Sequence, residues 1–419
     1  MIALADCNNF YVSCERIFNP KIQNKPVVVL SNNDGCIISR SNEAKSIGIK
    51  MGEPAFKYRD IFIKYNVNIF STNFALYSDM SDRVMSILSK SISNMEIYSI
   101  DEAFMDYSGL HDPFIYAFNM RKKIIKWTGI PLSIGIAETK TLAKVANKIA
   151  KKKIKSGIFY LNCSYEIKEH LKKICISKLW GIGNSYTDKL FKLGVRTAYD
   201  LTSQSDKWVK KYLSISGLKL VNELRGIPCY KLNTVWKRKQ SISTSRTFNK
   251  EIKSLDRLVE IISTYASISS IKLRREGSCA KSITVFITTN RFSSKDNCYL
   301  KGVKTIQLRN HTNNSMKIIS AAISALKSIY RENYLYKKAG IILSDINSDA
   351  NVQIDIFDDI NDIKKCSKIM QVVDKINDDY SRMYLRFAVC GIDKNWELRQ
   401  QYLSPCYTTK ISDLMNVYT

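Results

Sequence analysis

Two adjacent acids, Asp101 and Glu102, stand inside an apolar stretch, and a third acid, Asp6, ends the apolar run that opens the sequence. Residues 97–105 read as one strand, or as two strands that meet at a tight turn with the acids at the tip. Because successive strand side chains point to opposite faces, the two adjacent acids share a target only if the backbone bends there. Carboxylates that are buried together need a cation, so the three acids predict a metal site. The alternatives are a solvated hairpin tip and an ordinary turn at Asp6.

Apolar periodicity around these acids predicts the elements that position them. The expected elements are strands at 1–5 and 131–137 and helices at 74–93, 114–127 and 140–151. Residues 1–11 and 74–160 together predict an α+β sandwich with its acids at one edge.

The segment between these two parts reads as a small mixed insertion. Residues 26–39 form an expected hairpin, and a helix follows that opens at Ser41 and ends at Gly48. Lys45 lies near the start of this helix. It is an ordinary surface charge if it stands alone, but it could hold phosphate if it faces the metal site.

Residues 166–228 are expected to be helical with short loops, and they carry a candidate phosphate-binding turn. Gly181 and Gly183 would let backbone N–H groups approach a phosphate without an intervening side chain. A purely structural helical hairpin is the alternative. Residues 217–219 and 224–228 resemble a second, degenerate copy of this turn.

A second α+β unit with basic edges is expected over 241–346. The expected strands are 241–248, 282–287, 304–308 and 338–343, and the expected helices are 254–275 and 315–330. The linker before this unit contains Lys237, Arg238 and Lys239, which would suit a tether that lies along a DNA backbone.

Beyond residue 345 the charge reverses, and acids dominate a short stretch. Inside this stretch, Ile356 and Phe357 could fill an apolar pocket while Gln353 hydrogen-bonds its rim. An ordinary edge strand is the alternative for this peptide, which also includes Ile354. A helix at 361–378 and a strand at 384–389 are expected to follow.

The chain of 419 residues has 65 Lys and Arg against 38 Asp and Glu, a formal net charge of +27. Such a charge favours a polyanionic partner, and nucleic acid leads the candidates. A basic protein without such a partner is the alternative. No apolar run approaches the roughly 18 residues of a membrane span, and Met1 leads directly into a strand rather than a signal peptide. We therefore expect a soluble cytoplasmic protein of about three domains.

The eleven cysteines are odd in number and lack CxxC spacing, and the chain has only three His. No zinc site or disulfide framework is expected from this pattern. Reduced cysteines of this kind fit a cytoplasmic protein, where most of them pack as small apolar side chains.

The motifs together resemble the Y-family of translesion DNA polymerases, and within it the UmuC group, the catalytic subunits of bacterial DNA polymerase V. The acidic run SIDEAF at 99–104 and Asp6 at the end of the first strand carry the Y-family resemblance. The narrower resemblance rests on runs spread over essentially the whole chain. These runs lie at 25–36, 96–104, 139–144, 179–183, 338–340 and 403–409.

This resemblance implies an α+β multidomain fold shaped as a right-hand polymerase. The implied domains are the palm (1–11 and 72–160), fingers (12–71), a helix-hairpin-helix thumb (161–232), a linker (233–240), an α+β little finger (241–346) and a C-terminal region that binds clamp and partners (347–419).

The resemblance also implies the catalytic chemistry. Asp6, Asp101 and Glu102 would be the catalytic residues and would bind two Mg²⁺ ions, joined by the backbone carbonyl of Cys7. The substrates would be dNTPs. One ion would lower the pKa of the primer 3′-hydroxyl, and the other would bind the triphosphate and the leaving pyrophosphate.

Four further residues match family positions that contact the nucleotide. Tyr11 matches the steric gate, whose ring would collide with a ribose 2′-hydroxyl, and Phe10 would pack behind it. Lys45 and Lys151 match positions that hold the triphosphate. Many members have an Arg where this chain has Lys45, so the contacts here would be fewer and less bidentate.

The implied partners are primer–template DNA, the bacterial sliding clamp, a UmuD′-type dimer and RecA, with no membrane and a nucleoid-associated location. The clamp would bind the peptide Gln353–Phe357. The implied function is error-prone translesion synthesis in the SOS response, without a proofreading exonuclease. Two alternatives stay open: a catalytically idle subunit that docks DNA and clamp, and a nucleotidyl cyclase with a similar two-metal palm.

Overall fold

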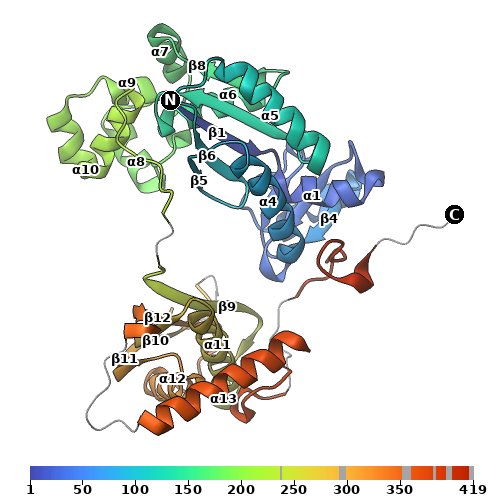
Figure 1. Ribbon diagram of the computed structural model, residues 1–419, viewed down its shortest axis with the longest axis vertical. Helices are drawn as coiled ribbons and strands as arrows, with labels where there is room; N and C mark the ends of the chain where they lie inside the picture. The colour runs from blue at the N-terminus through green and yellow to red at the C-terminus, as the bar shows by residue number, and fades with distance from the viewer. Residues whose placement is uncertain (236–237, 292–298, 352–359, 381–383, 393–398, 415–419) are drawn as a thin grey trace. The chain divides into compact units, whose positions relative to one another are not determined.

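The chain folds into two compact units in the computed structural model, which describes residues 1–235, 238–291, 299–351, 360–380, 384–392 and 399–414 (Figure 1). Unit 1 comprises Met1–Trp236 and Gln400–Thr419, and unit 2 comprises Lys237–Arg399. The final segment of the chain therefore returns to unit 1, which no sequence pattern predicted.

The central sheet of unit 1 has five strands in the order β5–β6–β1–β7–β8. Their bounds are β1 (Ile2–Cys7), β5 (Met95–Ile97), β6 (Glu102–Asp106), β7 (Leu132–Ala137) and β8 (Ile158–Leu161). Strand β1 lies in the middle, antiparallel to both of its neighbours, as its apolar composition predicts. The chain turns between β5 and β6, so the predicted bend at Asp101 is confirmed.

Helices cover both faces of this sheet (Figure 1). Their bounds are α1 (Phe10–Phe18), α4 (Phe74–Ser89), α5 (Pro113–Thr128) and α6 (Lys140–Lys153). Helices α1, α4 and α5 share one hydrophobic core with Ala3 and Ala5 of β1. Helix α6 shares the other core with Leu4. The alternation along β1 is what lets one strand contribute to two cores.

Helix α6 packs so closely on the sheet that a side chain at Gly135 would overlap the helix backbone. A Cβ atom added to Gly135 of β7 would lie 2.1 Å from the amide nitrogen of Asn147 and 2.4 Å from the carbonyl oxygen of Ala143. The Asn147 side chain donates hydrogen bonds to the carbonyl oxygens of Leu4 and Ser133. A glycine is therefore required where helix and strand backbones meet.

A smaller three-stranded sheet has the order β3–β2–β4, with β2 antiparallel to β3 and parallel to β4. The elements here are β2 (Val27–Leu30), β3 (Ile37–Arg40), α2 (Asn42–Ser46), α3 (Arg59–Lys64) and β4 (Asn68–Ser71). The Ser41 hydroxyl accepts a hydrogen bond from the Ala44 amide and caps α2. The predicted hairpin and the predicted helix start are both confirmed.

The helical part of unit 1 corrects one prediction. Its helices are α7 (Ser164–Lys172), α8 (Asn184–Lys192), α9 (Ala198–Thr202) and α10 (Asp206–Leu224). The part of the expected second glycine turn at 217–219 is wrong, because Gly217 lies inside the last helical stretch of α10 and packs on Leu213. The other part, 224–228, does leave the helix, since α10 ends at Leu224 and Gly226 adopts φ +89°. The backbone turns at Ser214 instead, at φ 65° and ψ −172°.

Unit 2 is a four-stranded antiparallel sheet in the order β11–β10–β12–β9, with α11 and α12 packed on it. Its elements are β9 (Ser241–Ile252), α11 (Leu255–Arg275), β10 (Ser278–Thr289), β11 (Lys301–Thr312), α12 (Ser315–Ile329), β12 (Tyr336–Ser348) and α13 (Ile360–Asp379). Each predicted strand and helix of the second α+β unit is present, with longer strands than expected. A bidentate ion pair between Arg274 and Asp374 ties α13 to α11.

The strand expected at 384–389 is wrong, since this segment holds only the short 3-10 helix η6 (Ala388–Cys390). The other 3-10 helices are η1 (Pro20–Ile22), η2 (Asn32–Asp34), η3 (Ala55–Tyr58), η4 (Ile176–Lys178), η5 (Asp349–Asn351) and η7 (Ile411–Asp413).

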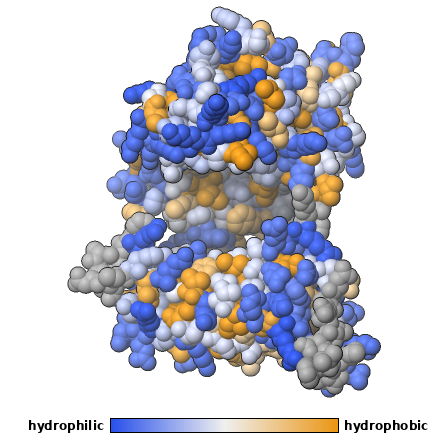
Figure 2. Space-filling view, turned by 90° about the vertical axis from the view of Figure 1, so that its left-hand side faces the viewer, coloured by the Kyte–Doolittle hydropathy of each residue, from blue (hydrophilic) through white to orange (hydrophobic). Residues whose placement is uncertain are grey.

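Hydrophilic side chains cover much of the visible face of each unit, with apolar side chains interspersed among them (Figure 2). None of the helices that the structure describes is long and apolar enough to cross a membrane.

Candidate active site

The three predicted acids meet at one edge of the central sheet of unit 1. Asp6 of β1 lies directly opposite Glu102 of β6 in the antiparallel register. The Cys7 amide donates to the carbonyl oxygen of Asp101 at 2.9 Å, and the Ser99 hydroxyl donates to the Asp101 carboxylate at 2.6 Å. These bonds fix the turn between β5 and β6 against the end of β1, so the prediction that the acids are neighbours is confirmed.

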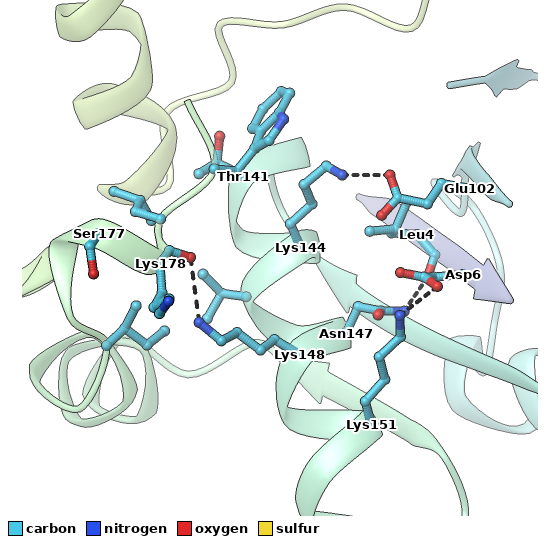
Figure 3. Close-up of a pocket in the computed structure, with 14 residues that line it drawn as sticks. Leu4, Asp6, Glu102, Thr141, Lys144, Asn147, Lys148, Lys151, Ser177 and Lys178 are labelled. Carbon is cyan, nitrogen blue, oxygen red and sulfur yellow. Dashed lines mark hydrogen bonds and ion pairs between the residues drawn. The ribbon is translucent and has the colours of Figure 1, made fainter. Parts of the chain in front are cut away.

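Lysines of α6 lie opposite the carboxylates and form ion pairs with two of them (Figure 3). Lys151 Nζ lies 2.5 Å from Asp6 Oδ1, and Lys144 Nζ lies 2.7 Å from Glu102 Oε2. They line a cavity of about 360 Å³ whose wall also includes Lys148. The acids therefore face a strongly cationic wall, which would attract the phosphates of a nucleotide.

Burial and positive charge act in opposite directions on Asp6. Burial raises the pKa of Asp6, the Lys151 ammonium lowers it, and the nearby Glu102 and Asp101 carboxylates raise it, which leaves the pKa at about 7. Carboxylate oxygens are the donors that Mg²⁺ prefers. Within the described ranges, no three acidic, Cys or His side chains form a ready-made metal cluster. Asp6 and Glu102 instead pair with Lys151 and Lys144, whose ammonium groups supply positive charge beside these carboxylates.

Cys7 and Phe10 both pack inward. The Cys7 side chain is buried in the core shared with α1, and burial raises the pKa of its thiol well above the usual range. A neutral buried thiol is a poor ligand for a hard cation. Only the backbone carbonyl of Cys7 can therefore serve the predicted role. Phe10 is buried, and its ring centroid lies 5.8 Å from that of Tyr11.

Tyr11 stands at the start of α1 with one face of its ring supported. Its ring stacks on Tyr77 of α4 with centroids 4.6 Å apart and an interplanar angle of 18°, and Phe74 meets its edge. Burial raises the pKa of the Tyr11 hydroxyl, and the charge of Asp101 raises it further. One face of the Tyr11 ring is therefore supported by Tyr77, and the hydroxyl lies close enough to Asp101 for the carboxylate charge to affect its pKa.

Lys45 of α2 belongs to the same electrostatic neighbourhood. Its Nζ donates to the side-chain oxygens of Asn9 at 2.5 Å and Asn42 at 3.2 Å. Burial lowers the pKa of Lys45, with Arg40 and Lys151 contributing in the same direction. The two predicted triphosphate lysines, Lys45 and Lys151, are thus close enough for the charge of one to affect the other, although they come from α2 and α6.

The remaining predicted DNA contacts are partly described. Gly181 adopts φ +85°, which a side chain would strain, and Gly183 precedes α8 with open space where a Cβ would stand. Lys239 forms an ion pair with Glu276 within unit 2, and an Arg238 N–H lies 3.5 Å from the Gly277 carbonyl oxygen. The Lys237 position and the candidate clamp peptide, which contains Gln353, Ile354, Ile356 and Phe357, lie outside the described residues.

Two buried acids were missed by the sequence reasoning. Glu223 of α10 accepts hydrogen bonds from the backbone amides of Thr141, Cys229 and Tyr230, and so joins α10 to the start of α6. Glu15 of α1 accepts bonds from the Tyr77 and Ser404 hydroxyls. A lone acid on the apolar stripe of α1 was the available signal for Glu15.

Glu15→Gln should stabilise the protein at about pH 8 and have little effect near pH 4.5. Burial raises the pKa of Glu15 from 4.5 to about 7, so the folded state keeps a proton that the unfolded chain releases. The stabilisation that this proton provides is complete below pH 4.5 and is lost as the pH rises through about 7, a difference of about 3 kcal/mol. Thermal unfolding of both proteins across this range measures the effect, and a pH-independent difference in melting temperature would contradict it.

The chain matches three protein-family models along its length. Residues 5–148 match the impB/mucB/samB family, and residues 239–356 match the C-terminal domain of the same family. Residues 367–417 match a domain of unknown function, DUF4113. The first match includes all three acids and Tyr11.

Individual relatives match over the whole chain. Protein UmuC of Salmonella typhimurium (strain LT2) is 38% identical over 422 residues, covering 100% of both chains. Protein ImpB of Salmonella typhimurium is 37% identical and covers 99% of both. Among solved structures, a Y-family DNA polymerase chimera of Dbh and Dpo4 matches with a TM-score of 0.68 at 21% identity, covering 83% of this chain and 100% of that one. The fold is therefore that of Y-family polymerases, as the sequence predicted.

Proposed function

The chain belongs to the impB/mucB/samB family, the UmuC-like branch of the Y-family DNA-directed DNA polymerases, and we propose that it performs error-prone translesion synthesis in the SOS response. One observation carries this proposal. Three carboxylates meet at the edge of the central sheet, beside the supported ring of Tyr11 and opposite the lysines of α6. This is the set of groups that template-directed nucleotidyl transfer needs.

Asp6, Asp101, Glu102 and the backbone carbonyl of Cys7 would hold two Mg²⁺ ions. Their oxygen donors and the raised pKa of Asp6 fit a site completed by divalent cations. When bound, such ions lower the pKa of the primer 3′-hydroxyl and neutralise the charge of the triphosphate and leaving pyrophosphate.

The chain's own side chains would orient the dNTP. Lys45 and Lys151 would each donate to triphosphate oxygens, and Lys151 would leave its ion pair with Asp6 to do so. The ring of Tyr11 would occupy the space of a ribose 2′-hydroxyl, because Tyr77 blocks its retreat on one side. The reaction is then favoured by position and by charge, since no protein group forms a covalent intermediate.

The same reasoning extends to the domains and the DNA. In our proposal residues 1–11 and 72–160, which hold the central sheet with α4, α5 and α6, are the palm, and residues 12–71, which hold the small sheet, are the fingers. The helices α7–α10 are the thumb, and unit 2 includes the little finger. The amides around Gly181 and Gly183 would hold a DNA phosphate. The proposed partners are the sliding clamp through Gln353–Phe357, a UmuD′-type dimer and RecA, in a nucleoid-associated complex.

Primer extension across a single abasic site tests the proposal. We expect the full-length protein to extend the primer past the lesion with dNTPs and Mg²⁺, most strongly when clamp, UmuD′-type dimer and RecA are added. The same primer on an undamaged template is the control, because it measures polymerase activity without a lesion. The ratio of extension past the lesion to extension on this control measures bypass. If no combination of these proteins extends the primer on either template, the proposed function is wrong.

A further inference from the structure

The last described segment of the chain, residues 400–414, forms a strap against unit 1 (Figure 1). Its first residues are held by the end of β4. The Ser71 amide donates to the Tyr402 carbonyl oxygen at 2.9 Å, and the Tyr402 amide donates to the Ser71 hydroxyl at 3.0 Å. The Gln401 amide donates to the Asp34 carboxylate at 2.9 Å. The strap therefore docks through specific backbone bonds rather than through surface contact alone.

The Asn73 side chain hydrogen-bonds the middle of this strap. Its side-chain nitrogen lies 3.0–3.1 Å from the Ser404 carbonyl and hydroxyl oxygens and from the Pro405 carbonyl oxygen. Its side-chain oxygen accepts from the Leu76 amide and caps α4. Both Asn73 and Ser404 are buried. The residue that begins α4 is thus also the residue that holds the strap, so the two are coupled.

Ser404 reaches further inward, to Glu15. The Ser404 hydroxyl donates to Glu15 Oε1 at 3.0 Å, and the Tyr77 hydroxyl donates to the same oxygen at 2.6 Å. Only 1% of Glu15 is exposed, so these hydroxyls replace the water that a carboxylate would otherwise bind. The buried Glu15 side chain therefore connects the strap directly to Tyr77.

Tyr77 is the residue on which Tyr11 stacks. The strap also contacts the opposite end of the helix that carries Tyr11, because Tyr407 stacks on Phe18 with centroids 4.9 Å apart and an interplanar angle of 12°. The strap thus supports α1 at its last residue and, through Glu15 and Tyr77, supports the ring at its first turn. The strap therefore supports the Tyr11 ring through two separate sets of contacts, one at each end of α1.

We propose that the strap is a positioning element for the steric gate, and that Ser404 and Glu15 are positioning residues for Tyr11. The inference rests on the proposed polymerase function, because sugar discrimination requires nucleotide transfer. It assigns a role to the end of the segment that matches a domain of unknown function. A gate that discriminates by collision depends on ring position, so loosening its support should admit ribonucleotides more than it slows deoxyribonucleotides.

Ser404→Ala in the full-length protein tests this role. The readout is kcat/KM for single-nucleotide primer extension with a dNTP and with the matching rNTP. We expect the preference for dNTP to fall about tenfold, mainly through a lower KM for the rNTP. Ser404→Thr, which keeps the hydroxyl, should restore the preference. Ile411→Ala, on an 87% exposed residue of the same strap, should leave it unchanged. An unaltered preference in Ser404→Ala would overturn the proposal.

A double variant asks whether the strap acts through the gate. In a Tyr11→Ala background, where discrimination by the ring is lost, adding Ser404→Ala should change the dNTP preference no further. The same tenfold loss in both backgrounds would mean that the strap acts elsewhere, and the proposal would be wrong.

Amide hydrogen exchange separates this inference from the proposed function, because it needs no catalysis. Ser404→Ala should raise exchange over 10–18 and 73–77 and leave α12 of unit 2 unaffected. If the wild type incorporates no nucleotide at all, the polymerase function fails and the gate role fails with it, while raised exchange would still establish the docking. Unchanged exchange over both segments would overturn the positioning role, whatever the activity.

Discussion

Asp101→Asn should lower single-nucleotide incorporation by at least about 10³-fold, the largest functional effect we expect from one substitution. The substitution keeps the side-chain size and an oxygen that can accept from Ser99. It also keeps the backbone bond from the Cys7 amide. It removes one negative charge from the site proposed to hold divalent cations. The loss should therefore appear in kcat on primed DNA, with an unaltered melting temperature.

Asp106→Asn is the matched control, because Asp106 ends the same strand β6 at the end remote from the acidic site. It should incorporate nucleotides like the wild type. Filter binding to primed DNA completes the comparison, since all three proteins should bind DNA with an affinity that falls steeply with salt. Equal incorporation by wild type and Asp101→Asn would instead favour an idle subunit that docks DNA and clamp.

Gly135→Ala should destabilise the protein by about 4 kcal/mol or more. A loss of this size is expected when a substitution forces two packed backbone segments apart. The added Cβ would stand 2.1 Å from the Asn147 amide nitrogen, where no rotamer change can relieve the overlap. Helix α6 would have to lift from β7, and Asn147 would lose its bonds to the sheet. Thermal unfolding and soluble yield measure the effect.

Gly35→Ala provides the comparison for this effect. Gly35 has an ordinary φ of −82°, and a Cβ there would meet its nearest neighbour at 3.5 Å, a normal contact. It should shift the melting temperature by no more than a few degrees. A Gly135→Ala protein as stable as Gly35→Ala would show that α6 can move away from the sheet at little cost.

The elements of the central sheet could be predicted because their patterns are local. The continuous apolar run of β1 predicts a central strand, and the adjacent acids predict the bend before β6, since one face cannot hold both otherwise. The failures occurred where local pattern was ambiguous. The glycine at 217 suggested a turn, but a residue with a side chain, Ser214, adopts the positive φ in its place. Residues 384–389 were expected to form a strand, yet no neighbouring strand pairs with them in the described parts of unit 2.

The supports of the site were beyond prediction for a different reason. Glu15 and Ser404 are separated by 389 residues, and only the folded chain shows that they share a hydrogen bond. The candidate site acids could be named because they lie where strands end, turn or begin: Asp6 near the end of β1, Asp101 in the turn after β5 and Glu102 at the start of β6. The residues that support the site lie on other elements, and no spacing in the sequence connects them.

Unit 2 is an insertion in the topological sense, because the chain leaves unit 1 after Trp236 and re-enters it at Gln400. The segment before the exit is anchored, since the Asn233 amide donates to Glu96 and Glu223 binds the amides of Cys229 and Tyr230. The strap anchors the return. The inserted stretch of chain therefore starts and ends on unit 1, and the hydrogen bonds of the strap hold its second end. Release of the strap would leave the inserted stretch attached to unit 1 at its first end alone, so the ends of a long loop would no longer be held together.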